Sequence, residues 1–91
     1  MKHATPAAMA ELAALLVQIR ALGTGGQRAA LVERRPGIFY RRGQAFLHFH
    51  EDPAGLFADL RAGGAEFVRW AVNTPAQQAE LLAAVARAAG H

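Results

Sequence analysis

Residues 38–61 read IFYRRGQAFLHFHEDPAGLFADLR. In this stretch, three segments rich in aromatic, β-branched and leucine residues alternate with two turn sequences, Arg-Gly-Gln and Pro-Ala-Gly. Because parallel strands need long crossover connections, turns this short predict consecutive antiparallel strands. The predicted strands are 38–41, 45–50 and 56–61, joined by turns at 42–44 and 51–55.

Two flanking segments extend this meander. Residues 65–72 predict a fourth strand after an Ala-Gly-Gly turn at 62–64. Residues 29–34 fit either a short edge strand or one helical turn, and we favour the strand; the Arg-Pro-Gly sequence at 35–37 ends either one. The glycine-rich residues 24–27 lack the lysine of a phosphate-binding loop and are expected to be a flexible connector.

A helix is predicted at each end of the chain. Residues 6–22 carry apolar side chains at three- and four-residue spacing, with Thr5 as the N-cap. The second helix begins after Thr74, where Gln77 completes a capping box, and Gly90 ends it. The fold class is therefore α+β: an antiparallel β-meander of four or five strands packed with an N-terminal and a C-terminal helix.

The composition limits both size and chemistry. A chain of 91 residues predicts one domain, 1–91, with a small core. It contains neither cysteine nor serine, which excludes Ser and Cys nucleophiles, cysteine-ligated zinc and iron–sulfur clusters. The longest apolar run, 12–17, is far below the roughly 20 residues that cross a bilayer, and the N-terminal sequence does not resemble a secretory signal. We expect a cytoplasmic protein that does not bind membranes.

Side chains in a strand alternate between faces, so each predicted strand divides into two sets. One set is almost wholly apolar and is expected under the helices. The other carries one phenylalanine per strand with ionisable groups, and we expect it to be left open. The helix-facing set is Ile38, Tyr40, Ala45, Leu47, Phe49, Leu56, Ala58, Leu60, Val68, Trp70 and Val72. The opposite set is Phe39, Arg41, Phe46, His48, His50, Phe57, Asp59, Arg61, Phe67 and Arg69.

Four phenylalanines on one uncovered face predict a partner, because contiguous exposed apolar patches usually mark a binding surface. The favoured interpretation is a homodimer whose interface contains Phe39, Phe46, Phe57 and Phe67. Two alternatives remain open: a monomer in which one helix or the 24–36 segment covers this face, and a face that binds a ligand or nucleic acid.

The His48-x-His50 motif is the sharpest chemical feature. Residues two apart on a strand point to the same side, so both imidazoles can reach one ion. With Asp52 or Asp59 they make a ligand set suited to Zn²⁺ or non-haem Fe²⁺, although no cofactor is assigned. The alternatives are hydrogen-bonded surface or interface histidines, or an acid–base pair that acts on bound water. No catalytic residue is assigned.

Basic charge is concentrated in one segment. Residues 28–42 contain five arginines and one glutamate, a net charge of +4, whereas 43–91 carry three arginines and five carboxylates, a net charge of −2. Arginines beside an aromatic sheet suit single-stranded nucleic acid, and a solvated basic edge is the alternative. The candidate anion-binding residues are Arg34, Arg35, Arg41 and Arg42.

Residues 43–60, GQAFLHFHEDPAGLFADL, resemble small uncharacterised bacterial domains sometimes labelled luciferase-like. Those domains have a strand with His-x-His, a short acidic turn and a strand of the type Leu-x-Asp-Leu/Ile. The resemblance implies an α+β domain with a recurring His-x-His motif, and no established reaction. This sequence departs from the pattern in its Pro-Ala-Gly turn at 53–55 and its Gly-Gly loop at 63–64.

Together, these observations predict a small binding or assembly domain that is not an enzyme and forms a homodimer through its phenylalanine-bearing face. A metal-dependent enzyme that uses His48 and His50 with a carboxylate is the first alternative. Single-stranded nucleic-acid binding through residues 28–42 is the second.

Overall fold

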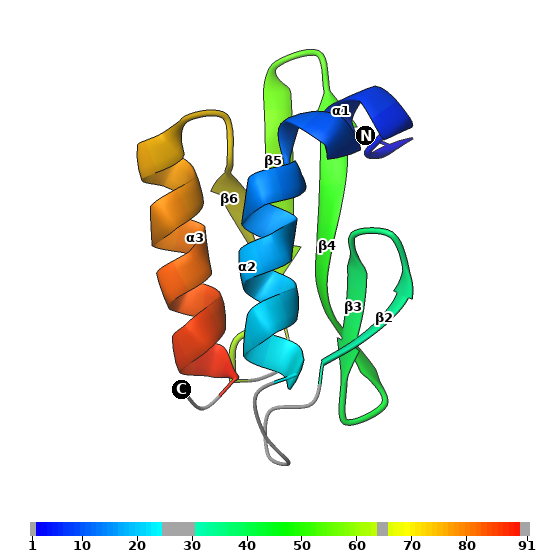
Figure 1. Cartoon of the computed structure of the whole chain (residues 1–91), viewed down its shortest axis with the longest axis vertical. Helices are drawn as coiled ribbons and strands as arrows, with labels where there is room; N and C mark the ends of the chain where they lie inside the picture. Colours follow the sequence, from blue (N-terminus) through cyan, green and yellow to red (C-terminus); the bar gives the residue numbers. More distant parts are fainter. Residues whose placement is uncertain (1, 25–30, 64–65, 90–91) are drawn as a thin grey trace.

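Figure 1 shows the computed structural model, which describes residues 2–24, 31–63 and 66–89. The helices are α1 (Pro6–Glu11), α2 (Ala13–Thr24) and α3 (Pro75–Ala88). The strands are β1 (Lys2–His3), β2 (Leu31–Arg35), β3 (Ile38–Arg41), β4 (Gln44–Asp52), β5 (Gly55–Leu60) and β6 (Val68–Ala71).

The sheet is an antiparallel meander in the order β2-β3-β4-β5-β6. This order confirms the predicted α+β fold, and it confirms the edge strand near residues 29–34 over a helical turn. The short strand β1, which the sequence did not predict, pairs with the second half of β4 through Lys2 opposite Glu51 and His3 opposite His50. Since β5 pairs with that half of β4 along its other edge, β1 lies on the same edge of β4 as β3.

Several predictions lie partly outside the described residues, and several strand boundaries move: β2 continues to Arg35, β4 begins at Gln44 and β5 ends at Leu60. The undescribed positions in these predictions are 25–27 of the connector, Arg28, residues 29 and 30 of the edge strand, residue 64 of the turn, residue 65 of the fourth strand, and Gly90. Within the described chain, β6 is shorter than the predicted 65–72 strand. The turn between β4 and β5 is shorter than 51–55, because Glu51 and Asp52 continue β4 and Gly55 begins β5.

The helices lie on one face of the sheet. In Figure 1, α2 and α3 stand side by side against the strands, with α1 across the upper end of the sheet. One hydrophobic cluster joins the two layers, and its leucines from the helical segments are Leu12, Leu15, Leu16 and Leu81. Its largest fully buried side chains are Phe39, Phe49, Leu12, Leu15, Ile19, Leu47, Leu60, Leu81, Val72 and Val85.

The N-terminal helical segment is divided in two, so the prediction of one helix over 6–22 is wrong. Leu12 leaves helical geometry, with φ −96° and ψ 4°, and separates α1 from α2. The apolar spacing continues through this break because the Leu12 side chain is itself buried in the core. The change of direction brings Thr5 to β4, where its N–H and hydroxyl donate to Glu51 Oε1 at 3.1 and 2.6 Å.

Both predicted N-caps are confirmed. The Thr5 hydroxyl accepts a hydrogen bond from the backbone N–H of Ala8 at 3.3 Å. Thr74 accepts one from the N–H of Gln77 at 3.1 Å, while the Gln77 side chain accepts the N–H of Thr74 at 3.3 Å. These reciprocal bonds satisfy donors that the first turn of a helix otherwise leaves open.

A bulge in β4 reverses part of the predicted division between the faces. Phe39 pairs with Leu47, but the next residue, Tyr40, pairs with Ala45, so Phe46 is an extra residue in β4. As a result, Phe46 and Leu47 are both buried, although they are adjacent in sequence. The prediction that Phe39 and Phe46 lie on the open face is therefore wrong, since both are core residues at 1% and 4% exposure.

The same bulge moves three other side chains in the opposite direction. The register places Ile38 across from His48, and Tyr40 across from Ala45, on the face turned away from the helices. Ile38, Tyr40 and Ala45 were predicted to face the helices, and that prediction is wrong. The rest of β4 and β5 follows the predicted alternation.

Candidate functional site

The face of the sheet turned away from the helices is called the open face below. The described helices all pack against the opposite side, so within the described chain no helix covers it. Among the described residues, the strand register and the ring contacts place these side chains on it: Val32, Ile38, Tyr40, Ala45, His48, His50, Phe57, Asp59, Phe67, Arg69 and Ala71.

A polar cluster occupies the middle of the open face. His48 on β4, Asp59 on β5 and Arg69 on β6 are direct cross-strand neighbours. Asp59 accepts hydrogen bonds from Arg69, with Nε 2.9 Å from Oδ1 and Nη2 3.1 Å from Oδ2. Its Oδ2 also lies 2.9 Å from Nε2 of His50, an ion pair when that imidazole is protonated. The rings of His50 and His48 meet edge to face at 4.6 Å.

The electrostatics of the cluster centre on Asp59, which is only 8% exposed. Burial is the largest influence and raises the pKa of the Asp59 carboxyl, but the hydrogen bonds and charge of Arg69, with smaller contributions from His50 and His48, outweigh it. The pKa of Asp59 is therefore below its ordinary value, and that of Arg69 is above its own. Asp59 is a carboxylate at neutral pH.

The structure brings together three of the four predicted metal ligands. One donor atom each from His48, His50 and Asp59 lie within 4.8 Å of one another. In a tetrahedral zinc site two donor atoms stand about 3.3–3.6 Å apart, so the side chains would have to move closer together to hold one ion. Asp52 does not join them, because its Oδ1 accepts the N–H of Ala54 in the β4–β5 turn at 2.9 Å.

Two of the four predicted interface phenylalanines, Phe57 and Phe67, do lie on the open face, and both are half-buried. The ring of Phe67 contacts that of His48 at 4.8 Å between centroids. The guanidinium of Arg61 lies 4.5 Å from the centre of the same ring. Phe67 therefore joins the histidine cluster to the end of β5.

The predicted anion-binding arginines divide into two pairs. Arg34 and Arg35 line a pocket of about 450 Å³ on the open face, together with Tyr40 and His48. The guanidinium carbon of Arg34 lies 4.2 Å from the centre of the Tyr40 ring, within the range of a cation–π contact.

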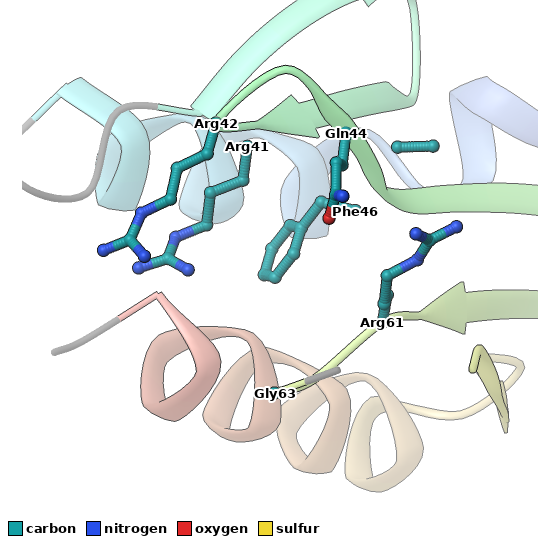
Figure 2. A pocket seen from close by; sticks show the side chains of 7 residues that line it. Arg41, Arg42, Gln44, Phe46, Arg61 and Gly63 are labelled. Carbon is teal, nitrogen blue, oxygen red and sulfur yellow. The ribbon is translucent and has the colours of Figure 1, made fainter. Parts of the chain in front are cut away.

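Arg41 and Arg42 line a separate pocket of about 340 Å³ (Figure 2). Arg61 at the end of β5 lines it too, and the sequence reasoning did not include Arg61 among the anion-binding candidates. The predicted meander already places the end of the third strand beside the second, which would have brought Arg61 near Arg41 and Arg42. In the structure, the N–H of Arg61 donates to the carbonyl of Phe46 at 2.8 Å.

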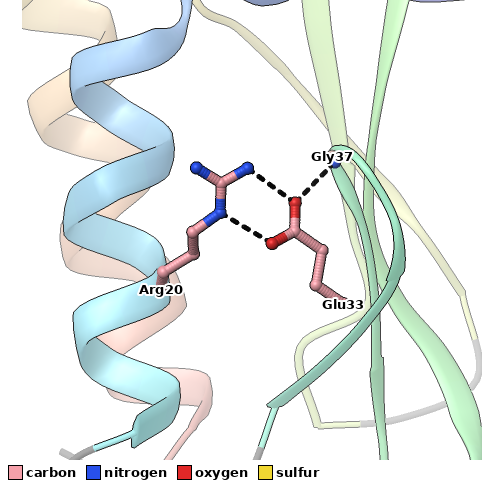
Figure 3. A network of polar contacts seen from close by, with 3 residues as sticks. All are labelled: Arg20, Glu33 and Gly37. Atoms are coloured by element: carbon pink, nitrogen blue, oxygen red, sulfur yellow. Dashed lines mark hydrogen bonds and ion pairs between the residues drawn. The ribbon is translucent and has the colours of Figure 1, made fainter.

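Glu33, the acidic residue within the arginine-rich segment, is engaged elsewhere. Figure 3 shows its carboxylate between Arg20 of α2 and the backbone of Gly37. Arg20 donates from Nε at 2.6 Å and Nη2 at 2.9 Å, and the Gly37 N–H donates at 2.9 Å. Chiefly because of the Arg20 hydrogen bonds, the pKa of Glu33 is lowered. Glu33 thus joins the helix layer to the sheet.

Comparisons with protein-family models, with curated proteins and with solved structures find no match for this chain. Among the residues that the structure describes, no helix is both long enough and apolar enough to span a bilayer. The class established by the fold is a small α+β domain with one helix-covered and one open sheet face, and the likeness to luciferase-like domains stays a prediction.

Proposed function

We propose that this protein is a non-enzymatic binding domain that forms a homodimer through its open face. The observation that carries the proposal is the pairing of Asp59 with Arg69 and His50 among half-buried aromatic side chains. A charge that is already paired can be buried against another protein, whereas an isolated buried charge costs several kcal/mol, roughly. Phe57 and Phe67 would supply the apolar contact.

A second copy of the chain is the partner that fits this surface. In a two-fold interface the same patch meets itself, so a charge without a partner in its own chain would face its own copy. The charge of Asp59 is balanced within the chain by that of Arg69 on the neighbouring strand. An interface of ordinary size buries about 800 Å² per partner. That is about one seventh of the 5432 Å² that one chain exposes, and it would extend a core that 91 residues keep small.

Light scattering coupled to size-exclusion chromatography, over a range of protein concentrations, tests the proposal. We expect a dimer for the wild-type protein and a monomer for Phe57→Asp, which places a charge in the interface. Val17→Asp is the matched control, because Val17 is 62% exposed on α2 and lies far from the open face. Circular dichroism must show both variants folded, and Ile38→Lys replaces Phe57→Asp if the latter does not fold.

A monomeric wild-type protein at the highest concentration would rule out the homodimer. So would a folded Phe57→Asp or Ile38→Lys variant that dimerises as strongly as Val17→Asp. Because the control introduces the same charge on the helix layer, loss of dimer in both aspartate variants would point to a general effect of charge, and the open face would not be the interface.

Metal-dependent catalysis is the second candidate, favoured by the convergence of His48, His50 and Asp59. A bound Zn²⁺ would supply a water of lowered pKa as nucleophile, which suits a chain without serine or cysteine. The guanidinium of Arg69 opposes it, because a cation already bonded to both Asp59 oxygens repels a metal ion and competes for its ligand.

Metal analysis of protein purified without a histidine tag separates the two candidates. The metal candidate predicts stoichiometric Zn²⁺ or Fe²⁺ that is lost in a His48→Ala, His50→Ala double variant and kept in Asp52→Asn. The assembly proposal predicts no stoichiometric metal. Asp52→Asn is the control because Asp52 lies on the same strand as the two histidines and carries the same charge as Asp59, but lies outside the cluster.

A further inference from the structure

A basic pocket lies at the end of the sheet where the β3–β4 turn approaches the end of β5. Figure 2 shows the guanidinium groups of Arg41 and Arg42 side by side, with that of Arg61 on the other side of Phe46. Arg41 and Arg61 are partly buried, whereas Arg42 is exposed. The described residues that line the pocket are Arg41, Arg42, Gln44, Ala45, Phe46, Arg61 and Gly63.

The charge of this pocket is uncompensated within its walls. None of the described residues that line it is acidic. The Nε atom of Arg41 is buried, and no described group accepts a hydrogen bond from it. Two adjacent guanidinium groups repel each other, and a buried N–H without an acceptor is unfavourable, so an anion placed between the arginines would relieve both costs.

The backbone also holds Arg42 in an unusual conformation. Arg42 and Gly43 form a two-residue turn with φ values of 54° and 80°. Such turns favour Asn, Asp or Gly at both positions, and arginine has no local hydrogen bond that would favour positive φ. Strained positions of this kind concentrate at functional sites. In this turn the Arg42 side chain lies alongside that of Arg41 (Figure 2).

We propose that this pocket binds the phosphate group of a small phosphate monoester. A monoester carries a charge of about −1.5 to −2 at neutral pH, which matches two guanidinium groups, and its oxygens accept the paired N–H groups of arginine. A carboxylate carries a single negative charge and would need only one of the two guanidinium groups. The pocket volume of about 340 Å³ lies in the range of small-molecule sites and leaves room beyond the phosphate. The side-chain amide of Gln44 can form a hydrogen bond with a hydroxyl group in the part of the ligand beyond its phosphate.

The proposal is independent of the homodimer and of the metal candidate. Isothermal titration calorimetry at low ionic strength, with ribose 5-phosphate, inorganic phosphate and ribose as probes, tests it. We expect ribose 5-phosphate to bind more tightly than inorganic phosphate, and ribose not to bind. Arg41→Gln and Arg42→Gln should each weaken binding at least about tenfold, because each removes a charge-assisted hydrogen-bond pair.

Arg35→Gln is the matched control, because it removes the same charge from an exposed arginine of the other arginine pocket. It should leave the affinity within about twofold of the wild type, since distant exposed charges are largely screened. Failure of the wild-type protein to bind ribose 5-phosphate would overturn the proposal. Equal weakening by Arg35→Gln would also overturn it, because binding would then follow net charge alone.

A single-stranded oligonucleotide without terminal phosphates distinguishes the pocket from a nucleic-acid surface. The proposal expects it to bind more weakly than ribose 5-phosphate and not to displace it. An oligonucleotide that binds more tightly, displaces ribose 5-phosphate and depends on Arg41 and Arg42 would overturn the monoester proposal in favour of nucleic-acid binding.

Discussion

The two faces of the sheet bury their side chains in different ways. On the helix-covered face, Phe39 and Phe49 are at most 2% exposed because whole helices pack on them. On the open face, Asp59 reaches 8% exposure because Arg69 and His50 bond to it from neighbouring strands. Apolar volume therefore stabilises the first face, and paired charge stabilises the centre of the second. Substitutions on the two faces should therefore change the free energy of unfolding by different amounts and with a different dependence on pH.

The largest contrast is expected between phenylalanines on opposite faces. Phe39→Ala should lower the free energy of unfolding by about 3–5 kcal/mol, the usual cost of a large buried cavity. Phe67→Ala, which removes a half-buried ring, should lower it by only about 1 kcal/mol. Urea unfolding at low protein concentration, where a dimer contributes little, measures both.

This pair of variants also tests the β4 bulge. Phe39 reaches the core only because Phe46 is an extra residue between the Phe39–Leu47 and Tyr40–Ala45 pairs. Without the bulge, Phe39 and Phe67 would share the open face and cost similar amounts. Equal losses of stability would therefore show that the register of β3 is wrong.

An intermediate effect is expected from the charge at the centre of the open face. Asp59→Asn should lower the free energy of unfolding by about 1–2 kcal/mol, because two hydrogen bonds to a charged acceptor are weakened and Arg69 keeps its charge. Asp52→Asn is the control and should be nearly neutral, since an amide oxygen can still accept the N–H of Ala54. Equal effects of the two variants would show that the central ion pair adds no stability.

A smaller effect is expected where a charge pair crosses between the layers on the covered side. Glu33→Gln should lower the free energy of unfolding by about 0.5–1 kcal/mol, because Arg20 is 44% exposed at its side chain and water screens the pair. Glu80→Gln, on the exposed surface of α3, removes the same charge and serves as the control, which should be nearly neutral. A loss above that of Asp59→Asn would reverse the order of the two ion pairs.

The sequence predicts most elements because their signals are local. The capping residues Thr5 and Thr74, the glycine-containing turns and the alternation of 47–50 with 57–60 depend on residues adjacent in the chain. The alternation also places His48, His50 and Asp59 on one face, so the composition of the cluster was predictable. Asp59 and Arg69 were assigned to the same face as well, although their pairing required the register of β6.

The features that the sequence does not reveal depend on contacts between distant segments. Ala45, Phe46 and Leu47 are all apolar, so no change of pattern marks the bulge. Leu12 keeps the apolar spacing through the helix break because its side chain stays in the core. In each case tertiary packing decides between conformations that the local pattern leaves equivalent.

The smallest expected difference, between the pH dependences of the two ion pairs, compares the two sides of the sheet directly. The pKa values of Asp59 and Glu33 are both lowered by folding, from ordinary values of 3.8 and 4.5. As the pH falls, the unfolded chain therefore binds these protons first, so the stabilisation is complete above the ordinary values and is lost as the pH falls through the folded ones. Wild-type protein should lose stability below about pH 4.5 more steeply than Asp59→Asn or Glu33→Gln.

Urea midpoints measured from neutral pH to below pH 3.8 should show each variant converging on the wild type as the corresponding carboxylate of the wild type becomes protonated. Convergence should begin at higher pH for Glu33→Gln than for Asp59→Asn, because the ordinary pKa of glutamate is the higher one. A gap to the wild type that stays constant across this range would mean that the variant acts through packing, and that the charge of its carboxylate does not stabilise its side of the sheet.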